Sequence, residues 1–262
     1  LDKRLIEFKS FSLVQFNDTY RDYHAQRVFN SILPPHGLKA MLIDLDGTLI
    51  PSERVFYDSW VYISERNYNC SFSIDEYVEH ELRKDHKLID YLKASGRLSE
   101  SIDTNAMMNK VYKHYNSAFK KMLYNHDSSP ELSVLHALHS KGIQLALVTT
   151  SKKEYVDMFF DVYKDFNNVF DIIITRFDVE KRKPSGEAYI KAASELNVDT
   201  KQCLVIEDSP KGIEAGLNAG MKSIAVSQHT VIDLMTNEIS VPVFDNVVEI
   251  ALIVNKYYKG GN

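Results

Sequence analysis

Cysteine is scarce in this chain, which has only Cys70 and Cys203 among its 262 residues. Two cysteines cannot build a disulfide framework, and neither has a partner at the spacing of a metal-binding pair. Cys203 opens the apolar run CLVI, so we interpret it as a small buried side chain. A fold that depends on several disulfides or on cysteine-bound metal is therefore not expected.

Long apolar runs and an excess of basic charge are lacking as well. No segment approaches the roughly 20 apolar residues of a membrane-spanning helix, and the first residues lack the pattern of a signal peptide. The formal net charge is -5, and basic clusters such as residues 181–183 are short. We therefore expect a cytoplasmic protein whose partners include neither a membrane nor a nucleic acid.

What the sequence does contain is an ordinary globular composition, with 44% hydrophobic and 26% charged residues. Apolar runs typical of buried parallel strands lie at residues 40–45, 143–149, 171–175, 203–207 and 223–226, with a weaker run at 241–244. Helical patterns between and after these runs lie at residues 152–166, 184–197, 210–219 and 246–257. Strands that alternate with helices predict an α/β fold with a Rossmann-like parallel sheet.

Two parts of the chain fall outside this alternation. Residues 52–127 have helical patterns and no strong strand, and Gly96 is expected at a turn between two helices. Residues 1–38 show only a short helical pattern at about 19–31, which Pro34 and Pro35 would end.

Polar side chains stand where three of the predicted strands end. They are Asp44 and Asp46 at the end of the first run, Thr149 and Thr150 at the second, and Glu207 and Asp208 at the fourth. The carboxyl ends of parallel strands share one edge of a sheet, so we expect these residues to lie together. Carboxylates gathered in one place repel each other unless a cation is present, and Mg²⁺ is the natural partner of such oxygen ligands.

The same edge offers groups that suit a phosphoryl group. Lys183 adds a positive charge, Thr149 a hydroxyl donor, and the loop around Gly47 backbone N–H groups. Phosphoryl transfer depends largely on positioning and charge stabilisation, and a carboxylate can serve as its nucleophile. Each residue alone has an ordinary structural interpretation, such as a surface loop, a strand end or a helix cap. Their occurrence together favours a phosphotransferase.

These residues lie in motifs that resemble those of the haloacid dehalogenase-like (HAD) hydrolases. DLDGT at 44–48 resembles the first motif, and Thr149 in LVTTS resembles the second. Lys183 in KRKPSGEAY resembles the third motif, and IEDSPKGIEAGLNAGM at 206–221 the fourth. The resemblance covers about residues 39–235. It implies a Mg²⁺-dependent phosphatase that acts on a small phosphomonoester of the sugar phosphate or nucleotide type.

The resemblance also implies a role for each residue. Asp44 is then the nucleophile that forms an aspartyl-phosphate, and Asp46 is the general acid and base. Thr149 and Lys183 hold the phosphoryl oxygens, with Thr150 as a further phosphate contact. The implied metal ligands are Asp208, a carboxylate oxygen of Asp44, the backbone carbonyl of Asp46 and, directly or through water, Glu207.

The spacing of the motifs leaves room for one inserted domain. The gap between Asp44 and Thr149 is far longer than the gap between Thr149 and Lys183. In the resembled family a helical cap occupies this place, and its closure excludes water from the site. The expected division is an N-terminal extension at 1–38, a Rossmann-like catalytic core at 39–52 and 129–262, and a helical cap domain at 53–128, with hinges near 51–53 and 127–131.

Other activities remain as alternatives. Dehalogenases lack the second aspartate, so Asp46 argues against dehalogenation. Beta-phosphoglucomutases carry a histidine where this chain has Phe56, which puts a sugar-phosphate mutase in doubt. A phosphonate hydrolase needs a cap lysine, and Lys84 and Lys87 have no special context. A non-catalytic binding or regulatory protein on the same scaffold is the alternative from another class.

The substrate and the assembly stay open. Basic cap residues could meet an anionic substrate, although each is more often an ordinary surface residue. They are Arg54, Arg83, Lys84, His86, Lys87 and Arg97. The N-terminal segment is interpreted as a helix packed on the core or as a dimer contact, so a homodimer is left open too.

Overall fold

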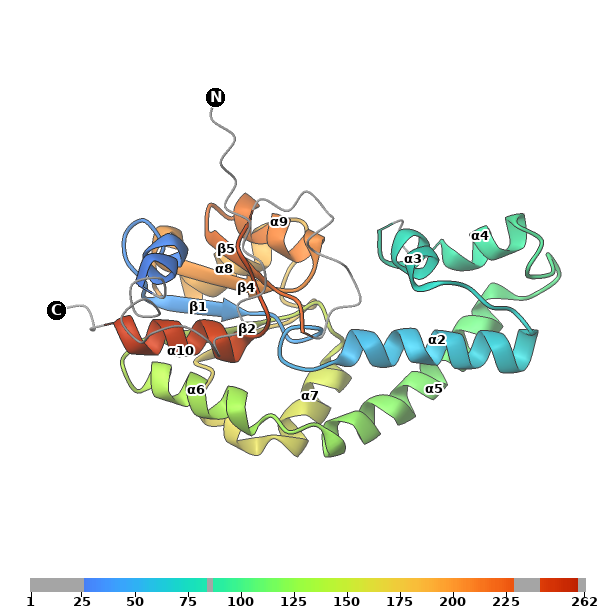
Figure 1. The fold of residues 1–262 in the computed structure, drawn as a ribbon, viewed down its shortest axis with the longest axis horizontal. Coiled ribbons are helices and arrows are strands. Elements are labelled where there is room, and N and C mark those ends of the chain that lie inside the picture. Colours follow the sequence, from blue (N-terminus) through green and yellow to red (C-terminus); the bar gives the residue numbers. More distant parts are fainter. Residues whose placement is uncertain (1–25, 84–86, 229–240, 259–262) are drawn as a thin grey trace, which may run out of the picture.

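The computed structural model describes residues 26–83, 87–228 and 241–258. Its centre is a parallel sheet of six strands in the order β3-β2-β1-β4-β5-β6 (Figure 1). The strands are β1 (Ala40–Ile43), β2 (Gln144–Val148), β3 (Ile172–Ile174), β4 (Cys203–Glu207), β5 (Lys222–Val226) and β6 (Val243–Phe244). The predicted strands are present, and the α/β class with a Rossmann-like parallel sheet is confirmed.

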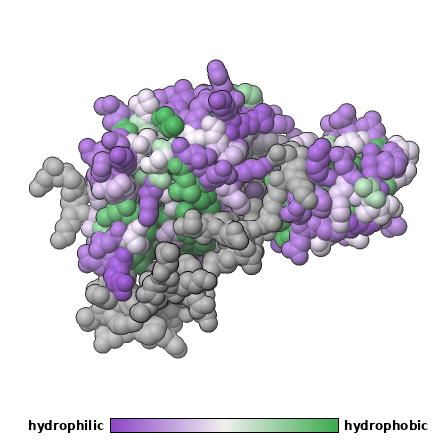
Figure 2. Space-filling model, turned by 90° about the horizontal axis from the view of Figure 1, so that it is seen from above, coloured by the Kyte–Doolittle hydropathy of each residue, from purple (hydrophilic) through white to green (hydrophobic). Residues whose placement is uncertain are grey.

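A helical insertion separates β1 from β2 in the chain. It consists of α2 (Ser52–Tyr68), α3 (Ile74–Tyr77), a π-helical turn (Val78–Arg83), α4 (Leu88–Ala94) and α5 (Thr104–Asn125). Helix α2 packs along α5, and a cluster of buried side chains that includes Trp60 joins them to α3 and α4. Figure 1 shows the insertion as a lobe beside the sheet, and in Figure 2 it is the smaller of the two lobes. Within the described residues, no helix combines the length and the apolar character that crossing a membrane requires.

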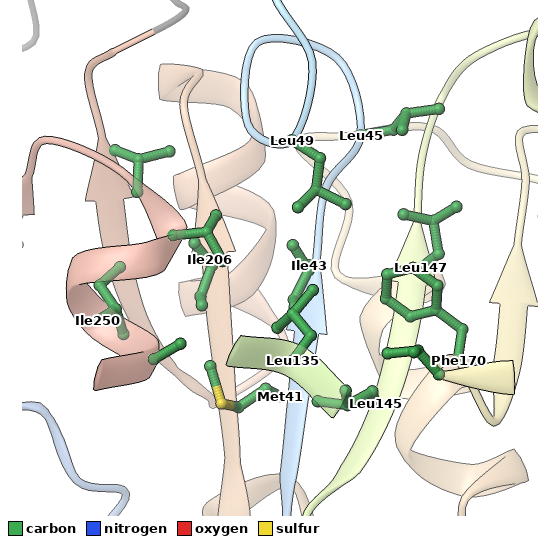
Figure 3. Close-up of a cluster of buried hydrophobic side chains, with 14 of the residues drawn as sticks. Met41, Ile43, Leu45, Leu49, Leu135, Leu145, Leu147, Phe170, Ile206 and Ile250 are labelled. Atoms are coloured by element: carbon green, nitrogen blue, oxygen red, sulfur yellow. The ribbon is translucent and has the colours of Figure 1, made fainter. Parts of the chain in front are cut away.

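Helices cover both faces of the sheet, which explains why its strands are continuous apolar runs. Met41 and Ile43 of β1 belong to a cluster on one face, shown in Figure 3, while Ala40 and Leu42 belong to a cluster on the other face. The first cluster is covered by α6 (Ser129–His139), α7 (Lys153–Val162) and α10 (Val247–Tyr257), and the second by α8 (Glu187–Glu195) and α9 (Pro210–Asn218). Alternate side chains of one strand thus fill two core layers.

Three helices differ from the predictions at their ends. The helix expected from Pro184 begins at Glu187, because the chain turns first and the Ser185 amide donates to the Arg182 carbonyl; the Lys183–Pro184 peptide bond is cis. The helix expected over 152–166 ends at Val162, and a 3₁₀ helix (Lys164–Asn168) follows. At the N-terminus residues 26–32 are helical. The remainder of the helix expected at 19–31 lies outside the described residues.

Glu76 and Arg97 form an ion pair in the helical insertion, and hydrogen bonds to Glu76 keep its carboxylate ionised. Glu76 accepts hydrogen bonds from Arg97 Nη2 at 2.7 Å and Nη1 at 3.1 Å, from the Ser73 amide at 2.8 Å and from the Tyr91 hydroxyl at 2.7 Å. These bonds, with those from Arg97 first, lower the pKa of Glu76 from 4.5 to about 2. A depressed folded-state pKa means that the stabilisation is present above about pH 4.5 and is lost as the pH falls toward 2.

We expect Glu76→Gln to lower the free energy of unfolding by about 1 kcal/mol at neutral pH. The effect is modest because the Glu76 side chain is 26% exposed and water screens the pair. In urea unfolding curves the difference from wild type should shrink as the pH is lowered from 5 to 3. A difference that stays constant over this range would show that the ionised carboxylate contributes nothing to stability.

Candidate active site

The strand-end residues meet around the side chain of Lys183. This lysine lies in the loop between β3 and α8, and its Nζ donates to Asp44 Oδ1 at 2.5 Å and to Glu207 Oε1 at 2.5 Å. A third hydrogen bond runs to the carbonyl of Val148, the last residue of β2, at 3.0 Å. The three charged side chains are each at most 7% exposed. The loop before α8 thus places one cation between the ends of β1, β2 and β4.

Burial and charge together determine how this group ionises. The pKa of Asp44 is raised well above its usual value, first by burial and then by the charge of Glu207, while Lys183 opposes the shift. Burial by itself lowers the pKa of Lys183, but the carboxylates of Asp44 and Glu207 outweigh burial and raise that pKa, so the ammonium group stays charged. One lysine does not balance the carboxylates, and a further cation would favour their ionised forms.

Asp208 adds another carboxylate, and one of its oxygens lacks a partner. The residue is 1% exposed, and its Oδ1 accepts from Thr48 Oγ1 at 3.2 Å. Its Oδ2 is buried with no hydrogen bond in the described part of the chain, which is costly unless another group binds there. Burial, followed by Glu53 and Glu207, raises the pKa of Asp208 well above its usual value. Oxygens of Asp44, Glu207 and Asp208 lie within 4.8 Å of one another, a set that fits a divalent cation such as Mg²⁺.

Gly47 lies directly against the unpartnered oxygen of Asp208. Its φ is +76°, and a Cβ atom at this position would lie 2.0 Å from Asp208 Oδ2. The Gly47 amide donates to the Ile50 carbonyl at 2.9 Å and closes the turn after β1. This amide is therefore used within the turn, and any amides for a phosphoryl group must come from other residues of the loop.

Asp46 lies beside the charged cluster and accepts hydrogen bonds from three hydroxyl groups. Its Oδ1 accepts from Ser52 Oγ at 2.6 Å, and its Oδ2 accepts from Thr149 Oγ1 at 3.2 Å and from Ser151 Oγ. Ser151 is absent from the predicted site, although its place two residues after Thr149 in LVTTS was a usable signal. Thr150, predicted together with Thr149, has an exposed side chain, whereas Thr149 is 2% exposed.

Both oxygens of Glu207 are bound within the fold. Oε1 accepts from Lys183 and also from the Tyr189 hydroxyl at 2.8 Å. Oε2 accepts from the amides of Asp208 at 3.1 Å and Ser209 at 3.3 Å and from Ser209 Oγ at 3.1 Å, at the start of α9. Burial raises the pKa of Tyr189 well above its usual value, so the phenol keeps its proton and donates. Like Ser52 and Ser151, Tyr189 is absent from the predicted site, because nothing in the helical pattern at 184–197 distinguishes it from a core residue.

The helical insertion contributes aromatic rings near Asp46. Phe56 of α2 contacts Tyr112 and Tyr115 of α5, with ring centroids 5.6 Å and 5.0 Å apart. The pKa of Tyr115 is raised well above its usual value, by burial first and by the charge of Asp46 next. The charge of Asp46, the carboxylate expected to act as acid and base, therefore acts on a buried ring of the α2–α5 pair.

Several basic residues considered for substrate binding are paired with acidic neighbours on the insertion itself. The pairs are Arg54 with Asp58, Lys87 with Asp90 and Arg97 with Glu76. The side chains of Arg83, Lys84 and His86 lie outside the described residues.

The chain is similar to known proteins in sequence and in fold. It is 25% identical over 239 residues to a bifunctional riboflavin kinase/FMN phosphatase of Arabidopsis thaliana, covering 84% of this chain but only 61% of that protein. It is 28% identical over 193 residues to a pyrophosphatase PpaX of Anoxybacillus flavithermus, covering 72% of this chain and 84% of that protein. A HAD family hydrolase structure from Deinococcus radiodurans, with bound phosphate and sodium, has a TM-score of 0.68 at 21% identity over 86% of this chain and 99% of that chain.

A family model described as haloacid dehalogenase-like hydrolase matches residues 41–226. This match covers well over half of the chain and includes all four motifs, with Asp44, Thr149, Lys183 and Asp208 inside it. The resemblance inferred from the motifs is thereby confirmed. The chain belongs to the haloacid dehalogenase-like hydrolase family.

Proposed function

We propose that this protein is a Mg²⁺-dependent phosphatase that hydrolyses a small phosphomonoester through an aspartyl-phosphate on Asp44. One observation carries the proposal: Lys183 Nζ lies 2.5 Å from Asp44 Oδ1. Asp208, close to Asp44, has a buried oxygen with no partner among the described residues. A buried nucleophile, a fixed cation and oxygens suited to a metal ion are what phosphoryl transfer uses. Membership of the HAD family supports the same reaction class.

The proposed reaction has two steps. In the first, an oxygen of Asp44 bonds to phosphorus while the bond from phosphorus to the leaving oxygen breaks, and Asp46 gives that oxygen a proton. In the second, Asp46 takes a proton from a water molecule, whose oxygen attacks phosphorus and releases Asp44 and inorganic phosphate. The hydroxyls of Ser52 and Ser151 orient the Asp46 carboxylate for both proton transfers.

Thr149 and Lys183 are the proposed ligands of the phosphoryl oxygens. Lys183 already donates to the carboxylate of Asp44, and Thr149 donates to that of Asp46, so both donors point toward the reacting groups. Lys183 also donates to Glu207 and to the Val148 carbonyl, and Thr149 has a single O–H, so each exchanges one present partner for a phosphoryl oxygen when substrate binds. The positive charge and the donors then stabilise the transition state. Thr150, with its exposed side chain, remains a proposed contact at the rim of the site.

The proposed Mg²⁺ ligands are Asp44, Asp208 and the backbone carbonyl of Asp46. Glu207 belongs to the same cluster, but both its oxygens already accept hydrogen bonds from Lys183, Tyr189 and the start of α9. We therefore assign Glu207 to holding Lys183, with any contact to the metal made through water. When bound, the ion neutralises charge on the phosphoryl oxygens.

The relatives name an FMN phosphatase and a pyrophosphatase, so small phosphorylated compounds are the proposed substrates. The cap at 53–128 is proposed to close over the core at 39–52 and 129–262 and to select the leaving group.

A mutase gains no support, because the histidine position of mutases is held by Phe56, packed among aromatic rings. A non-catalytic role gains none, because Asp44, Lys183 and Asp208, the residues proposed to act, lie together. The cytoplasmic location and the homodimer stay predictions.

The test is phosphate release from FMN, nucleoside monophosphates, sugar phosphates and inorganic pyrophosphate. We expect hydrolysis of at least one compound with Mg²⁺, and a rate at least about 100-fold lower in EDTA, since a metal ion supplies several kcal/mol of charge stabilisation. Excess Mg²⁺ should restore the rate, which controls for damage by the chelator. Release that is unchanged in EDTA would remove the metal from the proposal, and release from no compound would remove the phosphatase activity.

A further inference from the structure

The carboxylate of Glu207 is closely surrounded by its neighbours in the site. Gly212 of α9 lies so close that a Cβ there would be 1.9 Å from the Glu207 Cδ and Oε1 atoms. The start of α9 binds Oε2, as described above, and this fixes one side of the carboxylate. The other oxygen, Oε1, faces Lys183 and Tyr189. The strength of each hydrogen bond to Oε1 therefore depends on how Lys183 and Tyr189 share this oxygen.

Tyr189 contacts Lys183 and Glu207 at once. The residue is 0% exposed on α8, and its hydroxyl donates to Glu207 Oε1 at 2.8 Å. Lys183 Nζ lies over its ring, 5.1 Å from the ring centroid, where an ammonium group is attracted to the aromatic face. Lys183 also donates to Asp44 at the same 2.5 Å distance that it keeps from Glu207. The lysine is thus held between two carboxylates, and Tyr189 touches only one of them.

We propose that Tyr189 is a positioning residue that keeps Lys183 directed toward Asp44 by sharing Oε1 of Glu207. The phenol hydrogen bond withdraws charge from Oε1 and weakens the attraction of Glu207 for Lys183. Without it, Glu207 attracts Lys183 more strongly, and the ammonium group moves away from Asp44 and from a phosphoryl group bound there. The proposal rests on the phosphatase function above and adds to it a residue that touches neither substrate nor metal.

Tyr189→Phe keeps the ring and removes only the hydroxyl, so it isolates this effect. We expect kcat to fall about tenfold, the size of one hydrogen bond in the transition state. KM and the Mg²⁺ concentration for half-maximal rate should stay within about twofold, because Tyr189 is argued to contact neither ligand. In a Glu207→Gln background, the same substitution should change kcat less than about twofold, because its partner is already altered.

Tyr91→Phe is the matched control. Its hydroxyl donates to the carboxylate of Glu76, which also binds the cation Arg97. These three residues lie in the helical insertion, away from Lys183. This control should leave kcat within about twofold of wild type. Two results would overturn the positioning role: a Tyr189→Phe protein with wild-type kcat, or one whose Mg²⁺ requirement rises in step with the loss of rate. In both cases the activity of the wild-type protein would still support the proposed function. A wild-type protein that hydrolyses nothing would overturn both.

Discussion

Asp44→Asn is expected to reduce phosphate release at least about 1,000-fold while the protein stays folded. The side chain of asparagine has the same shape, and its carbonyl oxygen can still accept the hydrogen bond that Lys183 Nζ gives to Oδ1. It cannot act as the attacking oxygen, so no bond to phosphorus forms. The substitution removes a charge that burial and Glu207 disfavour, and Lys183 keeps its ion pair with Glu207, so the fold is not expected to be destabilised.

Two measurements separate a lost nucleophile from a damaged site. Thermal unfolding should give a midpoint within a few degrees of wild type. Acid-quenched protein from a reaction with labelled substrate should carry phosphate on the wild-type chain and none on the variant. Asp157→Asn is the control, since Asp157 is exposed and pairs only with Lys153 in the described structure. Turnover by the Asp44→Asn protein at more than a few per cent of wild type would exclude Asp44 as the nucleophile.

The sheet and the approximate site could be predicted because both depend on patterns that are local in sequence. A parallel strand buried on both faces must be apolar throughout, so the runs at 40–45 and 203–207 were recognisable. The first polar residue at the end of each run marks the sheet edge where ligands bind. Asp44, Thr149 and Glu207 follow from this rule without knowledge of the strand order.

The residues that the sequence prediction missed depend on packing between distant segments. Ser151 reaches Asp46 only because β1 and β2 are neighbours, a pairing that the apolar runs do not specify. Tyr189 has the periodicity of a core residue, and its role appears only when α8 is docked beside the end of β4. Helix α8 begins at Glu187 and not at the expected Pro184, and the cause again lies in distant contacts. Lys183 lies in a turn before the helix, and this turn directs its side chain into the site.

Gly47→Ala is expected to lower kcat/KM at least about 100-fold and to raise the Mg²⁺ concentration needed for half-maximal rate. The added Cβ would lie 2.0 Å from Oδ2 and 2.6 Å from Cγ of Asp208, far inside contact distance. Asp208 cannot retreat easily, because it is 1% exposed and is followed by Ser209, whose hydroxyl accepts from the Gly212 amide at 3.1 Å. The carboxylate or the turn after β1 must shift, and either shift displaces a proposed metal ligand.

The free energy of unfolding of the Gly47→Ala protein should also fall, for two reasons whose contributions can be measured separately. An alanine at φ +76° costs about 1–2 kcal/mol for its left-handed backbone alone. Overpacking against a buried group adds a further cost of about 1–3 kcal/mol. Gly142→Ala isolates the first amount, since Gly142 has φ +84° and nothing within 4 Å of its hypothetical Cβ. This control should lose about 1–2 kcal/mol and keep its kcat and its Mg²⁺ response.

The comparison of the two glycine variants tests the metal site without removing any proposed ligand. Both carry a similar positive φ, so a difference in Mg²⁺ response between them arises from the contact with Asp208. Isothermal titration of Mg²⁺ into each protein, measured without substrate, gives this difference independently of turnover. If Gly47→Ala bound Mg²⁺ as tightly as Gly142→Ala, the unpartnered oxygen of Asp208 would not be a metal ligand, and the ion would have to be bound elsewhere among the carboxylates.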